Sequence, residues 1–243
     1  MHSYKEHIVA FMDILGFKNI INTEDFENIR QMFLEIIPKE NEELALIRAA
    51  DPADPKDAPL IKYNKILQED RKIHIMSDSI VVAAPCQLPQ ALAVVIDTCM
   101  MVQQKLFELE KPIFLRGAVA KGDFYSNGSM IFGKALVDAY IAQEYYAEYP
   151  RIIVSDDVQN GMDMSLIREG HLCKDEDGYW YINALEDYIN YPYWNGTENN
   201  PTYTKLRTYI DRQLSGYTDR GIRNKYLWLD KQLKYIEYRA SCF

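Results

Sequence analysis

Apolar runs of strand length alternate with helically spaced apolar residues over the first two thirds of the chain. The run His7–Asp13 is apolar, ends in a carboxylate and leads to Gly16, which permits a tight turn. The segment Lys72–Ala84 has β-branched residues on both sides of Ser77–Ser79, a pattern typical of two strands joined by a short turn. These positions predict a strand, a helical segment and then a β-hairpin.

The same alternation continues after the hairpin. Apolar residues recur at helical spacing over Leu88–Leu109, and strand character returns over Ile113–Ala120. Glycines predict turns at Lys121-Gly122 and Asn127-Gly128, and a helix is expected over Gly133–Ala147. This part of the chain therefore predicts a second hairpin between two helices.

The buried strand Ile152–Val154 completes a predicted order of β, α, β, β, α, β, β, α, β. Beyond it, Tyr179–Ile182 has strand character, and residues 200–240 indicate two helices rich in tyrosine and charge. We therefore expect a core over residues 1–170 and an extension over residues 171–243 that packs on the core.

A break in the helical pattern before the first hairpin indicates an insertion. Residues 24–69 are mostly helical in pattern, but Asp51–Pro59 contains three prolines among polar residues. That composition is typical of an exposed loop. An insertion is expected at about residues 40–69.

The composition excludes several classes of protein. The 243 residues are 48% hydrophobic and 26% charged, which is typical of a globular protein and not of a disordered one. The net charge of -9 repels polyphosphate backbones, so no nucleic-acid partner is expected. No run approaches the ~20 apolar residues of a membrane helix, so no membrane partner is expected. Four scattered cysteines without a CxxC pair favour a cytoplasmic, reducing location.

Two acids occupy the ends of predicted strands. Asp13 ends the first strand, and Asp78 lies at the tip of the first hairpin. If these elements are neighbours in one sheet, the two carboxylates converge. Paired carboxylate oxygens are ligands that Mg²⁺ or Mn²⁺ requires when it clamps a triphosphate. The sequence therefore predicts a catalytic metal site at Asp13 and Asp78.

The residues after Asp13 offer backbone donors. The amides of Ile14, Leu15, Gly16 and Phe17 lead into a predicted helix. The N-terminus of a helix has unpaired N–H groups and the positive end of the helix dipole, which together bind phosphate oxygens. We expect these four residues to bind phosphate beside the metal site.

Several segments resemble the class III nucleotidyl cyclases. Phe11–Phe17 resembles the first metal motif of that family, and Ile75–Ile80 resembles the second, which is commonly Gly-Asp-Ser. Leu115–Val119 is similar to the next strand of the family, and Phe132–Val137 to the glycine-started helix after the second hairpin. The resemblance spans residues from about 5 to 158. It implies an α/β (α+β) fold with a ferredoxin-like core, a mostly antiparallel sheet, flanking helices and a C-terminal hairpin and helical extension.

The same resemblance implies the cofactors and their ligands. Two divalent ions, Mg²⁺ or Mn²⁺, would be bound by Asp13, Asp78 and Ile14. The substrate would be a nucleoside triphosphate, and the product a cyclic nucleotide.

A narrower likeness points to the Pycsar pyrimidine cyclases of bacterial antiphage defence. It is carried by Leu115–Ala118, Gly133–Leu136, Ala139-Tyr140, Pro150–Ile152, Asp177-Gly178 and Lys225–Leu229. Those enzymes make cyclic UMP or cyclic CMP as a second messenger. The resemblance implies a homodimer with two sites at the subunit interface, in which one chain supplies the metals and the other helps to read the base. It also implies a separate effector protein that senses the cyclic nucleotide.

The chain departs from the purine cyclases on the helix that begins near Gly133. Those enzymes carry an Asn there and, four residues later, an Arg that meets transition-state charge. The matching positions here are Val137 and Ile141, or Asp138 and Ala142 after a one-residue shift. Neither register supplies an Arg.

Three other cations are candidates for that role. Lys134, Arg116 and Lys121 are the nearest in sequence. A lone Lys or Arg is more often a solvated surface charge, so both interpretations stay open for each.

His74 is the candidate for base recognition. It lies four residues before Asp78, where the purine cyclases place a Lys for adenine or a Glu for guanine. Residues four apart on a strand share a face, and a ring donor and acceptor could reach the edge of a pyrimidine. A half-buried histidine satisfied by the backbone is the equal alternative.

Two hypotheses of function stay open. The first is an enzyme that converts UTP or CTP to the 3′,5′-cyclic monophosphate and pyrophosphate. The second is a cyclase-like nucleotide-binding or regulatory module without catalysis, which the missing helix Arg supports. A phosphodiesterase has little support, because no His-rich metal cluster is present. Asp175 and Asp177 with Gly178 predict a turn and not a calcium loop, since the later ligands and the closing Glu are missing.

Overall fold

One mixed sheet organises the molecule. The computed structural model describes residues 5–37, 54–88, 90–159, 164–168, 170–190 and 200–241. In this part of the chain the strand order is β2-β3-β1-β4-β6-β8-β7, and β5 pairs with β4 outside that path. All pairs are antiparallel except β4 with β6. The strands are β1 (Lys5–Ile14), β2 (Lys72–Met76), β3 (Ser79–Pro85), β4 (Leu115–Asn127), β5 (Met130–Phe132), β6 (Ile152–Val154), β7 (Leu172–Lys174) and β8 (Trp180–Ile182).

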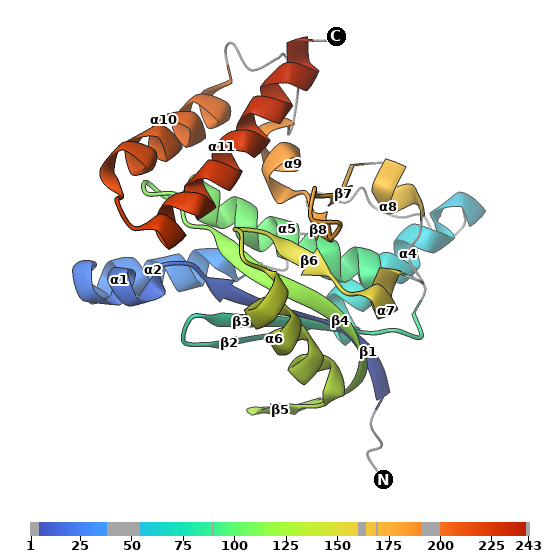
Figure 1. The fold of residues 1–243 in the computed structure, drawn as a ribbon. Coiled ribbons are helices and arrows are strands. Elements are labelled where there is room, and N and C mark those ends of the chain that lie inside the picture. The colour runs from blue at the N-terminus through green and yellow to red at the C-terminus, as the bar shows by residue number, and fades with distance from the viewer. Residues whose placement is uncertain are drawn as a thin grey trace.

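Helices cover both faces of the sheet (Figure 1). Helix α5 lies on one face and α6 on the other, while α10 and α11 pack across the end of the sheet near α1 and α2. No described helix combines the length and the apolar character that crossing a membrane requires. The described helices are α1 (Phe17–Thr23), α2 (Phe26–Ile36), α4 (Ala58–Lys65), α5 (Ala91–Glu108), α6 (Lys134–Tyr146), α7 (Asp156–Gln159), α8 (Met164–Arg168), α9 (Ala184–Asn190), α10 (Pro201–Gly216) and α11 (Arg220–Ser241), with shorter turns at Pro55–Asp57 and Ile66–Asp70.

The alternation of side chains along β1 decides which face carries the site. Ala10 and Met12 are fully buried in the core beneath α5. Val9 and Phe11 point the other way and pack with residues of α6. Because side chains alternate along a strand, Asp13 continues the second series and lies on the α6 face.

The predicted order of core elements and the mixed α/β fold with a mostly antiparallel sheet are confirmed. The turn predicted at Asn127-Gly128 is also present, between β4 and β5. The turn predicted at Lys121-Gly122 is wrong, because both residues continue β4 and pair with Ile8 and His7 of β1. Pairing along the whole of β1 outweighs the local preference of Gly for turns.

The predicted insertion falls partly outside the described residues. Of the proline-rich segment, residues 51–53 are not described, and Pro55–Asp57 forms a 3₁₀ turn that runs into α4. The expected exposure is confirmed for the described residues 54–59, all of which are exposed except Asp57 at 1%. The expectation of a loop is wrong for residues 55–59, which form helical structure. Proline is compatible with the first turn of a helix, so Pro55 and Pro59 start these elements instead of breaking them.

The C-terminal extension shares the sheet of the core. Strands β7 and β8 continue the sheet beyond β6. Helix α11 contributes Trp228, Leu229 and Leu233 to an apolar cluster that also contains Phe114 and Ile153 of the core. The division at about residue 170 stays a prediction, but the two parts pack as continuous structure.

A buried arginine ties the extension to the sheet. Arg151, whose side chain is 1% exposed, pairs with Asp175 and Asp177. The indole N–H of Trp228 donates to the same Asp175 carboxylate at 2.7 Å. Asp175 and Asp177 belong to the turn predicted here, in which the Gly178 amide donates to the Asp175 carbonyl at 3.0 Å. These acids therefore serve as counterions of Arg151.

Candidate active site

The two strand-end acids meet on the α6 face of the sheet. Asp13 lies opposite Ser79 of β3 on one side and Arg116 of β4 on the other. Asp78 sits in the turn just before Ser79, and its backbone carbonyl accepts the Ile14 amide at 2.9 Å. This bond holds the hairpin tip against the end of β1. The convergence expected from the sequence is therefore present.

The pair carries unfavourable like charge. Burial raises the pKa of the Asp13 carboxyl above its usual value, and the adjacent Asp78 carboxylate raises it further, while the Arg116 guanidinium opposes both. A hydrogen bond between the two carboxyl groups also raises the pKa of Asp13. Two acids held this close favour either a shared proton or a bound cation.

The turn that presents Asp78 is strained. Ser77 and Asp78 are the two residues between paired Met76 and Ser79, and Ser77 has a φ of 58°. A positive φ at the first of two central residues is the pattern of a type II′ hairpin, which favours glycine there. The family motif commonly has glycine at this position, and this chain adopts the same backbone at a cost.

Arg116 is the predicted cation that the structure brings to the acids. Its Nε donates to Asp13 Oδ2 at 3.3 Å, and its Nη2 donates to Glu144 Oε2 at 3.4 Å. With its amide oxygen turned towards Arg116, the buried Gln143 accepts from the same guanidinium at 2.7 and 3.0 Å. Helix α6 therefore contributes positioning groups for Arg116.

The other two cations lie elsewhere. Lys134 pairs with Asp138 on the surface of α6, and its side chain is 73% exposed. Lys121 lies opposite Ile8 in β1, five positions from Asp13, which corresponds to about 16 Å along a strand. In this structure Lys134 and Lys121 are solvated surface charges and do not adjoin the acid pair.

The predicted phosphate-binding turn is only partly available. The Ile14 amide donates to the Asp78 carbonyl, and the Leu15 amide donates to the Phe114 carbonyl, each at 2.9 Å. Contrary to the expectation, neither amide is an unpaired donor, because β1 continues to Ile14 and the Phe114 carbonyl accepts the amide of the next residue. Gly16, with a φ of 78°, and Phe17, the first residue of α1, remain candidates.

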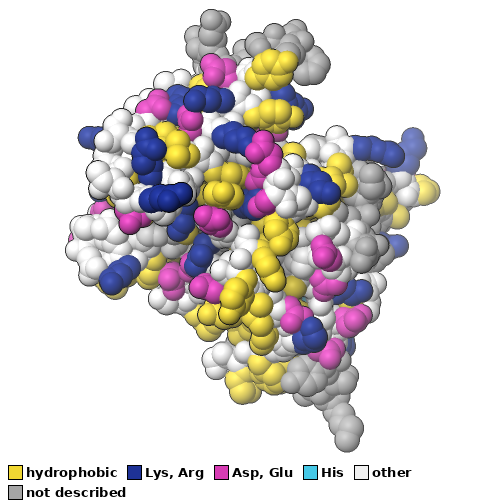
Figure 2. Space-filling model, viewed as in Figure 1, with side chains coloured by type: hydrophobic (Ala, Val, Ile, Leu, Met, Phe, Trp, Pro, Cys, Tyr) yellow, Lys and Arg dark blue, Asp and Glu magenta, His cyan; other side chains and the backbone are white. Residues whose placement is uncertain are grey.

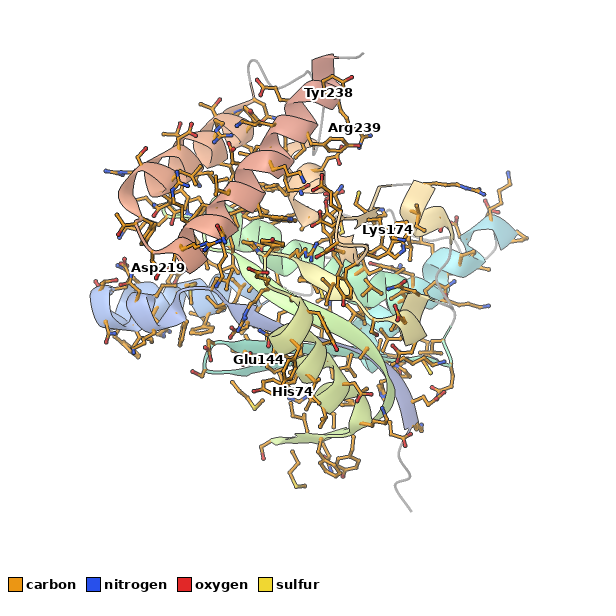
Figure 3. The ribbon with its side chains drawn as sticks, viewed as in Figure 1. His74, Glu144, Lys174, Asp219, Tyr238 and Arg239 are labelled. Carbon is orange, nitrogen blue, oxygen red and sulfur yellow. The ribbon has the colours of Figure 1, made fainter. Side chains whose placement is uncertain are left out.

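His74 faces the same side of the sheet as the acids. It pairs with Val81, whose side chain lies in the α6-side cluster. Its Nε2 lies 2.9 Å from the Ser126 hydroxyl of β4, and burial lowers the pKa of the imidazole (Figure 3). The imidazole therefore contacts a side-chain hydroxyl. The alternative to base recognition predicted a histidine whose hydrogen bond is to the backbone. The role of His74 stays a prediction.

Sequence reasoning missed one charged neighbour of the acids. Lys225 of α11 is half-buried, and it is close enough to Asp13 and Arg116 for both charges to change its pKa. Burial and then the Arg116 charge lower the pKa of Lys225, whereas the Asp13 carboxylate raises it. The only signal in the sequence is that the segment Lys225–Leu229 resembles the Pycsar cyclases, and that resemblance assigns no function to Lys225.

A cleft adjoins the turn after Asp13. Its volume is about 580 Å³, and α1, α2, α11 and the segment before β4 form its walls. Leu15, Gly16, Lys225 and Tyr226 are among the residues that line it. The size is within the range of small-ligand sites.

The acid pair fits divalent ions that arrive with a nucleotide. Among the described residues, no group of three or more His, Cys, Asp or Glu side chains has the geometry of a metal cage. Mg²⁺ is commonly held by one or two carboxylates plus substrate phosphates. The repulsion that raises the pKa of Asp13 is what a cation between the two acids would relieve.

Comparison with known proteins gives a likeness in structure only. No family model matches the chain, and no curated protein matches it. The adenylyl cyclase CyaB from P. aeruginosa is similar to it, with a TM-score of 0.44 and 14% identity over 74% of this chain and 94% of that one. The guanylyl cyclase domain of RhoGC from Blastocladiella emersonii has a TM-score of 0.44 and 12% identity over 74% and 95%. An adenylate/guanylate cyclase/hydrolase from Silicibacter pomeroyi has a TM-score of 0.44 and 13% identity over 74% and 95%.

Proposed function

We propose that this chain is a metal-dependent nucleotidyl cyclase that converts UTP or CTP to the 3′,5′-cyclic monophosphate and pyrophosphate. The observation that carries the proposal is the convergence of Asp13 and Asp78 at adjoining strand ends, with Arg116 beside them. The sequence resemblance of both acid motifs to the class III cyclases supports it.

The chemistry needs an anion-stabilising site and an aligned hydroxyl. The ribose 3′ oxygen forms a bond to the α-phosphorus while the bond to the β-phosphate oxygen breaks, so pyrophosphate leaves and the hydroxyl proton passes to water. Mg²⁺ or Mn²⁺ ions, when bound, would lower the pKa of the hydroxyl and neutralise the leaving group. Asp13, Asp78 and the Ile14 carbonyl would hold those ions. Arg116 would orient the Asp13 carboxylate and add positive charge near the phosphates.

Pyrimidine selectivity is proposed from His74. The position carries neither the Lys nor the Glu of the purine cyclases that the motif resembles. The Ser126 hydroxyl fixes one ring nitrogen, so the imidazole presents a defined edge on the α6 face. An imidazole of fixed orientation suits recognition of a small base by one or two hydrogen bonds.

An exposed apolar surface supports a homodimer with sites at its interface. Helix α6 exposes Val137, Tyr140 and Ile141, and the adjoining strand β5 exposes Met130 and Phe132. Figure 2 shows hydrophobic side chains gathered over this part of the molecule. The surface borders the face that carries Asp13, so a second copy docked here would close the site. In the proposed antiphage role, a separate effector protein senses the released cyclic nucleotide.

A nucleotide-binding module is the second candidate. It is favoured by the exposed apolar side chains of Val137 and Ile141, where the purine cyclases carry the catalytic Asn and Arg. Incubation of purified protein with Mn²⁺ and each nucleoside triphosphate separately, followed by chromatography, distinguishes the two. Cyclic UMP or cyclic CMP supports the enzyme, whereas binding without turnover supports the module.

A further inference from the structure

We propose that Lys225, in the C-terminal extension, is a phosphate-binding residue of the same site and supplies a cation that α6 lacks. The inference rests on the proposed function and deepens it. It makes α11 a part of the active site instead of a remote support.

The turn that follows Asp13 shares an apolar cluster with the C-terminal helices. Leu15 joins the apolar cluster that contains Leu229 and Tyr226 of α11. The Leu15 amide is fixed by the Phe114 carbonyl at 2.9 Å, and the Phe114 ring lies edge-on to Tyr226 with centroids 6.3 Å apart. The position of α11 is thereby tied to the backbone beside the acid pair.

Lys225 lines the same cleft as Gly16, a remaining candidate for phosphate binding. Leu15 and Tyr226 also line this cleft, whose volume is about 580 Å³. Asp219, at the start of α11, caps the helix by accepting the Ile222 amide at 2.9 Å (Figure 3). The cap fixes the first turns of the helix, so Lys225 is presented from a rigid element.

Lys225 has charged neighbours but no ion-pair partner within the described part of the chain. Elsewhere on α11, Lys231 pairs with Glu176, and Lys234 pairs with Asp230 at 2.9 Å. Lys225 lies near Arg116, and the carboxylates of Asp13, Glu148 and Asp219 are also near it without forming an ion pair. An ammonium without a salt bridge, on the wall of a cleft and near a guanidinium, is suited to phosphate oxygens, which both cations can bind.

The chemistry of lysine suits the position. Its ammonium is a compact point charge with three donors on a flexible stem, which can follow a phosphate group as charge moves to the leaving pyrophosphate. Arginine at 225 would keep the charge, and methionine would keep most of the packing of the stem.

The test compares Lys225→Met and Lys225→Arg with the wild-type chain, and Lys231→Met serves as the matched control on the same helix. Two readouts are needed: steady-state formation of cyclic nucleotide, and calorimetric binding of tripolyphosphate in Mg²⁺. We expect Lys225→Met to lose about 10²-fold in kcat/KM and to bind tripolyphosphate at least about tenfold more weakly. Lys225→Arg should recover part of both losses, and Lys231→Met should match the wild type. Circular dichroism and thermal unfolding verify that each variant is folded.

Equal tripolyphosphate affinity in wild type and Lys225→Met would overturn the inference, as would no measurable affinity in the wild type. If the wild type binds tripolyphosphate through Lys225 but forms no cyclic product, the proposed reaction fails and the phosphate site stands. If product forms equally well in wild type and Lys225→Met, the reaction stands and the role of Lys225 is refuted.

Discussion

Replacing Asp78 by Asn should abolish product formation and also stabilise the metal-free protein at neutral pH. The substitution removes the charge that repels Asp13. It leaves the backbone carbonyl that accepts the Ile14 amide, so the hairpin tip stays in place. A residue whose role is structural would instead lower stability when changed, so the combination of lost activity and gained stability is specific to a binding role.

The size of the stabilisation follows from the geometry. Two unit charges about 4 Å apart repel by about 4 kcal/mol at an effective dielectric constant of 20. The side chains of Asp13 and Arg116 are 21% and 23% exposed, and Arg116 offsets part of the repulsion. Solvent screening and this counterion reduce the expected gain to about 1 kcal/mol. For a chain of this size, the unfolding temperature should rise by about 2–4 °C.

The pH dependence has a definite sign. Since the pKa of Asp13 is raised in the folded state, the folded protein binds the proton more tightly than the unfolded one. The repulsion therefore destabilises the fold above the folded-state pKa and disappears below the unfolded value. The stabilisation by Asp78→Asn should be present at pH 7 and absent near pH 3.

Thermal unfolding in chelated buffer at both pH values measures this difference, and chromatography of the nucleotide products measures activity. The control is Asp211→Asn, which removes an exposed partner of Arg207 and should change stability by less than about 0.5 kcal/mol without loss of activity. We expect Asp78→Asn to lose at least about 10²-fold in activity. Retained product formation, or a lower unfolding temperature at pH 7, would refute the reasoning.

Three further predictions concern the frame of the site. Arg151→Met should cost about 3 kcal/mol or more in urea unfolding, because it leaves Asp175 buried without its counterion; a loss below about 1 kcal/mol would contradict this. Gly117→Ala should cost about 1–3 kcal/mol in the same assay, since its Cβ would lie 2.5 Å from the Phe11 carbonyl oxygen, and an unchanged midpoint would disprove the close approach. Ser77→Gly should raise the free energy of unfolding by about 0.5–1 kcal/mol, and with it the urea midpoint, because glycine accepts the positive φ; activity should be retained. A lower midpoint would show that the turn is not strained.

The core of the fold and the acid pair could be predicted from local pattern. Each element of the core is short and strongly periodic, and Asp13 and Asp78 stand at the ends of strands that are neighbours in the sheet. When β1 and β3 pair, Ser79 lies opposite Asp13, and the turn before Ser79 then presents Asp78 beside Asp13.

The parts that were wrong or missed depend on tertiary contacts. Lys121-Gly122 has the composition of a turn, but the partner strand β1 is long enough to extend β4 through it. The local pattern predicts a strand that ends at Asp13 and free amides at Ile14 and Leu15, whereas carbonyls from two other segments accept both amides. Lys225 could not be assigned because the packing of α11 on Leu15 is not encoded in any local pattern.

The register between β1 and β4 is what keeps Asp13 on the face where Arg116 can reach it. A slip of one residue would turn Asp13 into the core beneath α5, where Met12 and Ile14 are buried. Gly117 opposes such a slip, because only a residue without a Cβ allows β4 to approach the Phe11 carbonyl at this point. Gly117 therefore helps to fix the strand register, and this register places the neighbouring Arg116 beside Asp13. The segment Leu115–Val119 thus supplies both the cation and the residue that positions it.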